Sequence, residues 1–135
     1  MTFAWPEYLK VAEDLLKMRN HSAGDEAIVR ATVSRAYYAA HRVAHDEIIG
    51  KRGIQLPQTA GGVHEQVIQA LYTVKDAEWS KVGDELAILR RLRVHADYHL
   101  TLPGEWGNSP DALRKKAIFE IARSGWLLKV IPALP

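Results

Sequence analysis

Arginine and histidine side chains lie close together in one segment late in the chain. Arg93 is followed by His95 and His99, and Asp97 lies between the two histidines. Arginine stabilises a negatively charged phosphate through its planar fork of donors, and histidine transfers protons near neutral pH. Cleavage of RNA without a metal needs both functions, because protons must move while a cation faces the crowded phosphate. The segment therefore indicates phosphodiester chemistry.

An apolar stripe predicts that Arg93 faces the inside of a helix. Its members recur at steps of four and three residues: Val82, Leu86, Leu89, Arg93, Ala96 and Leu100. A buried guanidinium is costly unless it is paired. Arg93 is therefore expected either to pair with Asp97, one turn further on, or to face a polar cleft.

The spacing between Arg93 and His99 limits how the two could act together. Six positions on one helix separate their directions by about 120°. Either the helix ends near Tyr98 and His99 turns back, or a two-fold dimer builds one site from two copies of the helix. The structural alternative is that Arg93 pairs with Asp97 inside the bundle and His99 only ends the helix.

The rest of the chain reads as helices that must position this segment. Apolar spacing, capping residues and breakers predict helices over residues 6–18, 25–49, 63–73, 77–98 and 110–132. Ser109 is the expected N-cap of the last helix, with Pro110 at its first position. We predict an all-α, up-and-down bundle of four main helices plus one short helix, forming a single domain over residues 1–135.

Composition excludes several classes of protein. The 135 residues carry a net charge of only +2, so overall charge does not argue for nucleic acid. The absence of cysteine excludes disulfides and thiolate metal sites, and it favours a cytoplasmic location. No apolar run is long enough to span a membrane, and the first residues do not resemble a signal peptide.

The other histidines and the paired tyrosines have less specific interpretations. His41 and His45, like His95 and His99, lie one turn apart, but neither pair has an obvious third ligand. We therefore expect surface pairs and no metal site. His64 is expected to cap or pack a helix start. Neighbouring Tyr37 and Tyr38 differ by about 100° on a helix, so one should be core while the other could line a cleft and stack on a base. Core packing of both tyrosines is the favoured alternative.

Two motifs resemble those of the HEPN domain family. Ser34-Arg35-Ala36-Tyr37-Tyr38 is similar to its Ser-Arg-x-Tyr-Tyr signature, and residues 93–98 are similar to its Arg-x-x-Ala-Asp-Tyr segment. The resemblance extends from about residue 6 to residue 130. It implies an all-helical bundle that usually dimerises. Many members are metal-independent ribonucleases, often toxins paired with a minimal nucleotidyltransferase or another antitoxin, and others only bind nucleotides or partners.

The resemblance also implies a catalytic motif, in which four to six residues separate an arginine from a histidine. Two pairs match, Arg93 with His99 and Arg90 with His95. We prefer the first pair because Arg93 is the inward arginine. The residue after Arg93 is Val94, where active members often carry a polar residue.

These observations lead to one functional hypothesis and two alternatives. The first is a homodimeric, metal-independent endoribonuclease of a toxin–antitoxin system, acting on RNA without a cofactor. The alternatives are a non-catalytic HEPN module that binds a nucleotide or a nucleotidyltransferase partner, and a structural bundle without a ligand. The candidate catalytic residues are Arg93, His99 and His95, and the candidate binding residues are Arg90, Asp97, Tyr98, Tyr38 and Arg35. For Arg35, pairing with a carboxylate is the expected structural alternative.

Overall fold

The chain folds into helices, as its periodicity predicts. The computed structural model describes residues 3–18, 24–58 and 61–135, and within these ranges it contains helices but no strand. The main helices are α1 (Glu7–Lys17), α2 (Asp25–His45), α3 (Val63–Thr73), α4 (Ala77–Tyr98) and α5 (Pro110–Val130). Shorter helical turns are η1 (Asp46–Lys51), η2 (Gly104–Trp106) and η3 (Ile131–Ala133). The all-α prediction is confirmed.

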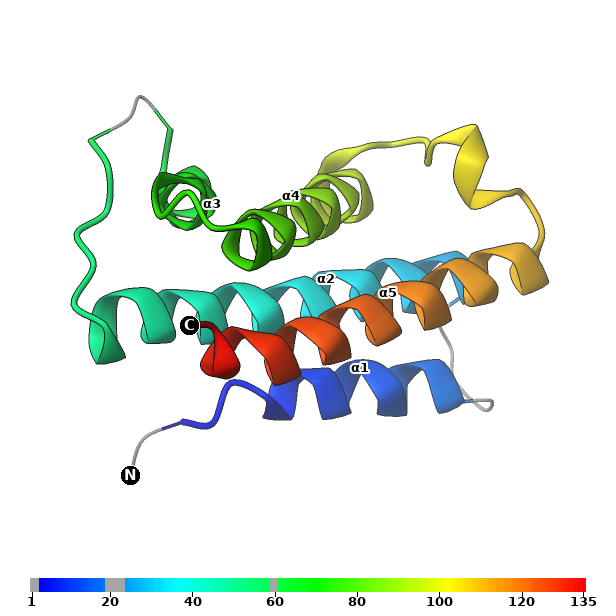
Figure 1. The fold of residues 1–135 in the computed structure, drawn as a ribbon. Helices are drawn as coiled ribbons and strands as arrows, with labels where there is room; N and C mark the ends of the chain where they lie inside the picture. Colours follow the sequence, from blue (N-terminus) through cyan, green and yellow to red (C-terminus); the bar gives the residue numbers. More distant parts are fainter. Residues whose placement is uncertain (1–2, 19–23, 59–60) are drawn as a thin grey trace.

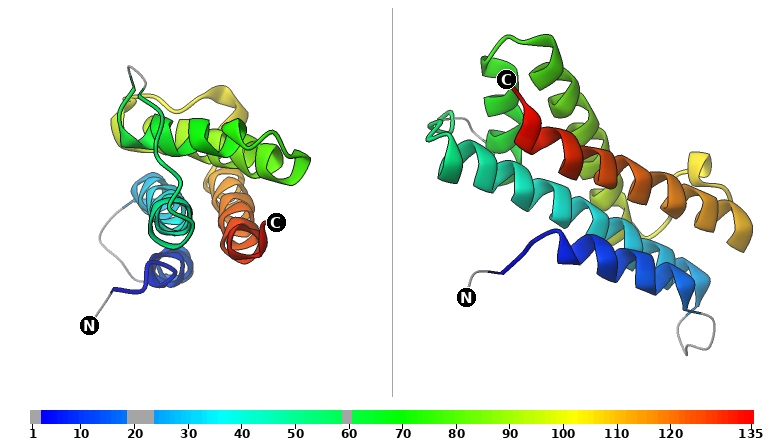
Figure 2. Two further views of the ribbon diagram at one scale, coloured as in Figure 1. Left: turned by 60° about the vertical axis from the view of Figure 1, so that its left-hand side comes forward. Right: turned by 60° about the horizontal axis from the view of Figure 1, so that its bottom comes forward.

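The helix α2 forms the centre of the arrangement. It packs against α1, α4 and α5, and more lightly against α3. Figure 1 shows α1, α2 and α5 side by side, with α1 running opposite to the other two. The α3–α4 pair lies across them at a steep angle, as the left view of Figure 2 also shows. The fold is therefore not a plain up-and-down bundle, because one helical pair crosses the remaining three helices.

Apolar stripes on these helices build two adjoining cores. The larger core lies between α2, α3, α4 and the end of α5, and the smaller one joins α1, α2 and α4 to the start of α5. The predicted stripe on α4 is buried from Val82 to Ala96. Its last expected member, Leu100, is instead 97% exposed, because α4 ends at Tyr98 and the chain has turned away. The register and the limits of α4 are thus as predicted, and only the expected burial of Leu100, beyond the end of the helix, is wrong.

Short polar contacts define where α4 and α5 begin. The Ser109 side chain accepts a hydrogen bond from the Ala112 amide, so the predicted cap of α5 is confirmed. Asp76 caps α4 by accepting hydrogen bonds from the amides of Glu78 and Trp79. These caps satisfy amides that would otherwise have no partner in the first turn.

The end of α2 differs from the prediction. The helix was expected to continue to Ile49, but from Asp46 to Lys51 the backbone widens into a π-helical turn. Gly53 then takes a φ of 63°, a left-handed conformation that suits glycine and reverses the chain. This reversal leads into the loop that returns the chain to α3.

A glycine allows α3 and α4 to approach closely. A Cβ added to Gly83 would lie 2.8 Å from the ring of Tyr72 on α3. The Tyr72 hydroxyl donates to Asp84 across the same contact, at 2.6 Å. The closeness of the two helices fixes the position of α4, which carries Arg93.

One arginine on α2 holds the far end of α4. The guanidinium of Arg30 donates to four backbone carbonyls, those of His95 (3.3 Å), Ala96 (3.0 Å), His99 (2.6 Å) and Leu100 (3.1 Å). These carbonyls include groups that a helix end leaves without intrahelical partners. No glycine caps the C-terminus of α4. The Arg30 side chain, which comes from another helix, caps it by donating to these carbonyls.

Candidate functional site

An open cleft of about 660 Å³ lies where α1, α2 and the end of α4 meet. Aromatic and charged side chains line it: Trp5, Tyr8, Ser34, Arg35, Tyr38, Arg42, Asp97 and Tyr98. Four of these were candidate binding residues from the sequence, namely Arg35, Tyr38, Asp97 and Tyr98. The cleft combines aromatic faces with charged groups of both signs.

One wall of the cleft is a single face of α2. Arg35, Tyr38 and Arg42 follow one another at spacings of three and four residues, so they share that face. The Arg35 guanidinium lies between two rings, 5.3 Å from the centroid of Tyr8 and 5.5 Å from that of Tyr38. The Arg42 guanidinium lies 4.4 Å from the ring of Trp5. The aromatic rings thus hold both cations by cation–π contact.

Both cations keep binding capacity for an anion. Among residues 3–18, 24–58 and 61–135, no carboxylate lies within 4.0 Å of the guanidinium of Arg35 or Arg42. The expected pairing of Arg35 with a carboxylate is therefore wrong, since Arg35 lies against aromatic rings instead. The Nε of Arg42 is buried without a hydrogen-bond partner in the same part of the chain. Both side chains line the cleft, and guanidinium groups without a carboxylate partner bind phosphate oxygens well.

The opposite wall carries a carboxylate that is held in place. Oδ2 of Asp97 accepts a hydrogen bond from the Ser34 hydroxyl at 3.2 Å and lies 3.7 Å from the Arg93 guanidinium. Of the two alternatives left open for Arg93, the structure shows the pairing with Asp97. The Asp97 side chain is 27% exposed, so one side of the pair faces solvent in the cleft.

Arg93 itself lies behind the cleft rather than in it. It is only 5% exposed and does not line the cavity. Its guanidinium lies 5.1 Å from the ring centroid of Tyr37, 5.3 Å from that of Tyr38 and 5.7 Å from that of Tyr98. Arg93 therefore packs behind Tyr38 and Tyr98, and its positive charge lies on the far side of their rings from the cleft.

The structure separates Arg93 from the histidines expected to act with it. His99 follows the end of α4 and is exposed, and its ring lies 4.5 Å from that of His95. His95 lines a groove between α3 and α4, on another side of the helix from Arg93. Burial, His99 and Arg91 lower the pKa of His95. Within the described ranges, no hydrogen bond, ion pair or ring contact joins Arg93 to His95 or His99, and neither histidine lines the cleft.

The alternative pair from the sequence is also engaged elsewhere. Arg90 donates to Glu65 of α3 at 2.6 Å and lines the same groove as His95. Of the candidate residues on α4, the cleft thus receives Asp97 and Tyr98, and Tyr98 stands at its mouth with 73% of its surface exposed.

A buried cluster next to Arg93 was not predicted. The hydroxyl of Tyr37 and Nδ1 of His64 lie 2.6 Å apart, which joins α2 to the start of α3. The ring of His41 lies 4.3 Å from that of His64 and stacks on Tyr37 at 5.5 Å. His41 is 2% exposed, so the expectation of a surface pair with His45 is wrong.

Burial, together with positive neighbours at the two histidines, favours the uncharged form of each member of this cluster. Burial lowers the pKa of His41 to about 3, with smaller contributions from His64 and nearby cations. Burial, Arg93 and Arg90 lower the pKa of His64, and burial raises the pKa of Tyr37. A neutral His64 with its ring proton on Nε2 can accept a hydrogen bond at Nδ1 from the Tyr37 hydroxyl.

Helical spacing contained the signal for this cluster. His41 follows the buried Tyr37 by four residues on α2, and His64 precedes the buried pair Val67 and Ile68 on α3. Both histidines therefore occupy inward positions of helices whose register was predicted. His41 was instead expected in a surface pair with His45, and His64 was expected to cap or pack the start of its helix.

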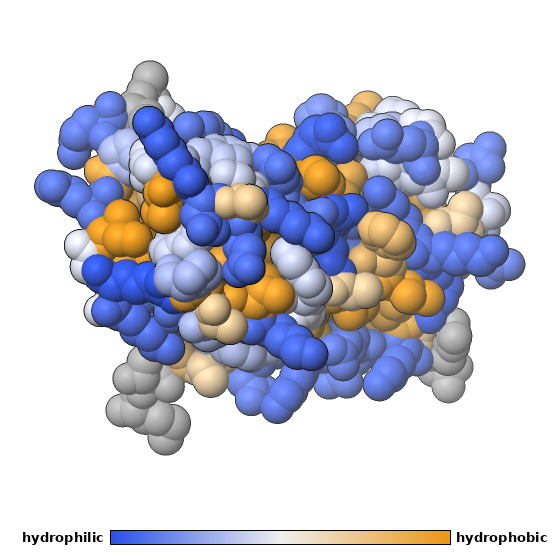
Figure 3. Space-filling model, viewed as in Figure 1, coloured by the Kyte–Doolittle hydropathy of each residue, from blue (hydrophilic) through white to orange (hydrophobic). Residues whose placement is uncertain are grey.

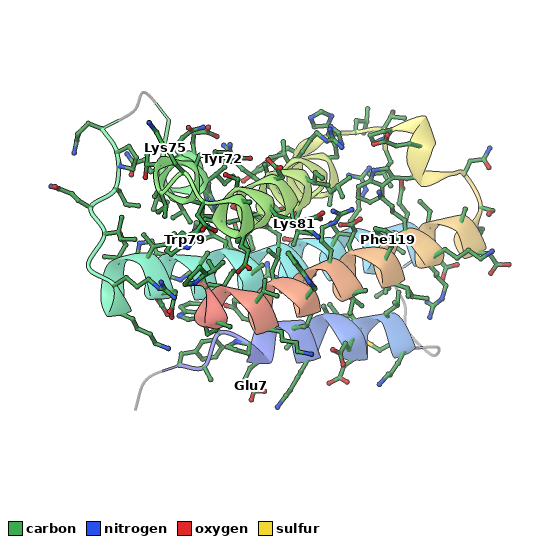
Figure 4. The ribbon with its side chains drawn as sticks, viewed as in Figure 1. Glu7, Tyr72, Lys75, Trp79, Lys81 and Phe119 are labelled. Atoms are coloured by element: carbon green, nitrogen blue, oxygen red, sulfur yellow. The ribbon has the colours of Figure 1, made fainter. Side chains whose placement is uncertain are left out.

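A second hollow surface lies between α4 and α5. Two hollows of about 350 and 420 Å³ share Lys81 and Trp126, and the Lys81 ammonium lies 5.3 Å from the Trp126 ring. Figure 3 shows mixed polar and apolar side chains on this face, and Figure 4 labels Lys81 and Phe119 there. None of the residues lining these hollows lines the cleft. The surface thus provides a place for control substitutions.

Comparisons add no family assignment. The chain gives no match to protein-family models, to curated proteins or to solved structures. The resemblance to HEPN domains therefore stays a prediction from the residues quoted above. In the part of the chain that the structure describes, no group of three potential metal ligands comes together. Over the same residues, no helix combines the length and apolarity needed to cross a bilayer.

Proposed function

We propose that the protein is a HEPN-type module that binds a nucleotide unit, free or within single-stranded RNA, in the cleft between α1, α2 and α4. The observation that carries the proposal is the face of α2 on which Tyr38 lies between Arg35 and Arg42. Aromatic rings stack on bases of any sequence, and unpaired guanidinium groups bind phosphates. The proposal corresponds to the non-catalytic alternative, because no histidine within residues 3–18, 24–58 and 61–135 lines this cleft.

A binding experiment tests this proposal directly. We would measure fluorescence anisotropy of a labelled 12-nucleotide single-stranded RNA at several salt concentrations. Replacing both Arg35 and Arg42 by alanine should weaken binding at least about tenfold and reduce the salt dependence, because fewer phosphates are neutralised. Tyr38→Ala should weaken binding through lost stacking, which contributes about 1–3 kcal/mol per base.

The matched control removes the same charge from the other face. Replacing Lys81 and Lys129 by alanine also lowers the net charge by two, but both residues lie between α4 and α5. This variant should bind RNA within about twofold of the parent. Equal losses in the two double variants would mean that binding is non-specific attraction to a basic protein, and they would contradict the proposal.

Endoribonuclease activity is a second candidate, and one observation favours it. Arg93 is buried directly behind two tyrosines of the cleft, and its distance to Asp97 is 3.7 Å, longer than a strong ion-paired hydrogen bond. In this proposal Arg93 stabilises the charge of the scissile phosphate, and His99 or His95 of a second copy transfers the proton. The 2′-hydroxyl gives up its proton and attacks phosphorus, the bond from phosphorus to the 5′-oxygen breaks, and the leaving 5′-oxygen takes up a proton. One product therefore carries a 2′,3′-cyclic phosphate and the other a 5′-hydroxyl.

Cleavage is tested with the same RNA in excess EDTA. Arg93→Ala should lower the rate by about 10²–10³-fold, and His99→Ala by about 10²–10⁴-fold. RNA that is bound but left intact would reject the enzymatic candidate and leave the binding proposal standing.

Dimerisation belongs to the same proposal. Tyr98 is 73% exposed and Leu100 is 97% exposed, and both lie at the end of α4 next to the cleft. A second copy, or an antitoxin such as a minimal nucleotidyltransferase, would cover these apolar surfaces. Light scattering should give a dimer, and Leu100→Glu should shift it towards monomer. A monomeric parent at tens of micromolar would contradict the homodimer.

A further inference from the structure

The charged side chains are distributed unevenly along the cleft. Arg42 and Trp5 lie at one end, whereas Ser34, Asp97 and Tyr98 lie at the other. Ser34 and Arg42 are eight residues apart on α2, which corresponds to about 12 Å of helix. A phosphate is attracted to Arg42 and Arg35, whereas the only carboxylate among the lining residues lies at the other end, where Arg93 at 3.7 Å offsets part of its charge. A bound nucleotide therefore has one favoured direction.

Asp97 is prepared to accept a hydrogen bond from a neutral donor. Its Oδ2 is held by the Ser34 hydroxyl at 3.2 Å and by Arg93 at 3.7 Å, which restrains the carboxylate. Within the described part of the chain, Oδ1 receives no hydrogen bond. The side chain lines the cleft and is partly exposed. An ionised carboxylate only accepts, so its partner must be a hydroxyl or an N–H group.

A sugar hydroxyl fits this position better than a base. The aromatic residues near Asp97 are Tyr38 and Tyr98. Arg35 and Arg93 lie over the ring of Tyr38, whereas Tyr98 is 73% exposed and has ring surface open to a base. A base stacked there leaves the sugar between the stacked ring and the phosphate, within reach of a side chain on the cleft wall. Carboxylates serve the same purpose in dinucleotide-binding folds, where they accept the 2′-hydroxyl of ribose.

We propose that Asp97 accepts a hydrogen bond from the 2′-hydroxyl of the bound nucleotide, with the phosphate at Arg42, so that the cleft selects ribose over 2′-deoxyribose. This inference rests on the proposed nucleotide binding. It makes Asp97 a specificity-determining residue, and Ser34 the residue that positions it. The 2′-hydroxyl is the group by which a protein distinguishes RNA from DNA at one site.

The test compares three 12-nucleotide strands of one sequence: RNA, DNA and 2′-O-methyl RNA. The methylated strand keeps the sugar oxygen but loses its proton. The parent protein should bind RNA about 10- to 100-fold more tightly than either other strand, because a hydrogen bond to a charged group is lost with both. A preference that follows the base sequence, and not the sugar, would overturn the inference.

A substitution separates recognition of the sugar from a structural role. Asp97→Asn keeps the size of the side chain but removes its charge. It should weaken RNA binding and leave DNA binding equal or tighter, since the repulsion of phosphate also disappears. A folding defect would weaken both strands together. Ser34→Ala, which keeps the carboxylate, should retain a reduced preference for RNA.

The outcomes distinguish the two proposals. If the parent binds RNA and DNA with equal affinity, sugar recognition by Asp97 is overturned and nucleotide binding stands. If the parent binds neither strand, nucleotide binding itself fails and the inference fails with it. If Asp97→Asn does not fold, the parent's own preference for RNA over 2′-O-methyl RNA still decides the question.

Discussion

The hydroxyl of Tyr37 lies 2.6 Å from Nδ1 of His64, and this hydrogen bond connects the centre of α2 to the first turn of α3. Tyr37 is fully buried, and Arg93 lies against its ring. The bond therefore anchors the α3–α4 pair to α2 beside the cleft.

Removing this hydroxyl should destabilise the fold. Tyr37→Phe leaves His64 without its partner in a partly buried place, and it should lower the free energy of unfolding by about 1–3 kcal/mol. Urea denaturation measures the change. The matched control is Tyr72→Phe, which removes an exposed hydrogen bond to Asp84 and should cost about 1 kcal/mol or less. Equal losses would contradict a special role for the Tyr37–His64 contact.

The ends of the α4 stripe should respond very differently to truncation. Leu89 is fully buried, so Leu89→Ala should cost about 2–5 kcal/mol by leaving a cavity. Leu100 is 97% exposed, so Leu100→Ala should change monomer stability by no more than about 0.5 kcal/mol. Thermal or urea unfolding of the two variants checks the register of α4. A large cost at Leu100 at low protein concentration would contradict the observed helix end.

Replacing Asp97 should cost more stability than replacing Arg93, although the two residues form one pair. Asp97→Ala leaves a guanidinium that is 5% exposed without its carboxylate, and it should cost about 3–5 kcal/mol. Arg93→Met leaves a carboxylate that water and Ser34 can still solvate, so it should cost less. The double variant should be more stable than the sum of the two single losses predicts, with a coupling of about 0.5–3 kcal/mol. Additive losses would show that the two charges do not interact.

Stability should fall as the pH drops through the range where histidine titrates. Burial lowers the pKa of His41 from 6.5 to about 3, so between these values the unfolded chain binds a proton that the folded protein excludes. The contribution is fully present above pH 6.5 and is lost as the pH falls towards 3, with a slope of up to about 1.4 kcal/mol per pH unit.

The substitution His41→Phe isolates this contribution. Nδ1 of His41 is buried without a hydrogen-bond partner in the described residues, so an aromatic ring of similar shape can replace it. Denaturation between pH 5 and 6.5 should then show a shallower dependence than the parent, while His64 and His95 retain their own effect. A slope identical to that of the parent would mean that His41 is protonated in the folded protein.

Much of the architecture was predictable because the information is local. The limits of α3 and α4 follow from apolar spacing, and Ser109 and Pro110 mark the start of α5. The π-helical turn after α2 and the steep crossing of α3 and α4 were not predictable. Both depend on contacts between distant segments, such as the approach of Tyr72 to Gly83.

The candidate site was predictable in part for the same reason. Tyr38, Asp97 and Tyr98 reach the cleft because helix register already placed them on the right faces. Asp97 was expected as a partner of Arg93, but Tyr37 and His64 were not, because they approach it from α2 and α3 and not from its own helix. Trp5 and Tyr8 complete the cleft only because α1 packs on α2.

The hydrogen bonds between Arg30 and the end of α4 have a mechanical consequence. Four carbonyls at the end of α4 accept hydrogen bonds from this one side chain of α2, the helix that also carries Arg35 and Arg42. Unwinding of the last turn of α4 would have to break these hydrogen bonds together. They therefore restrain Asp97 and Tyr98 relative to α2. The hydrogen bonds of Arg30 thereby restrain the distance between α2 and the end of α4. These two walls of the cleft are thus held in position before a ligand binds.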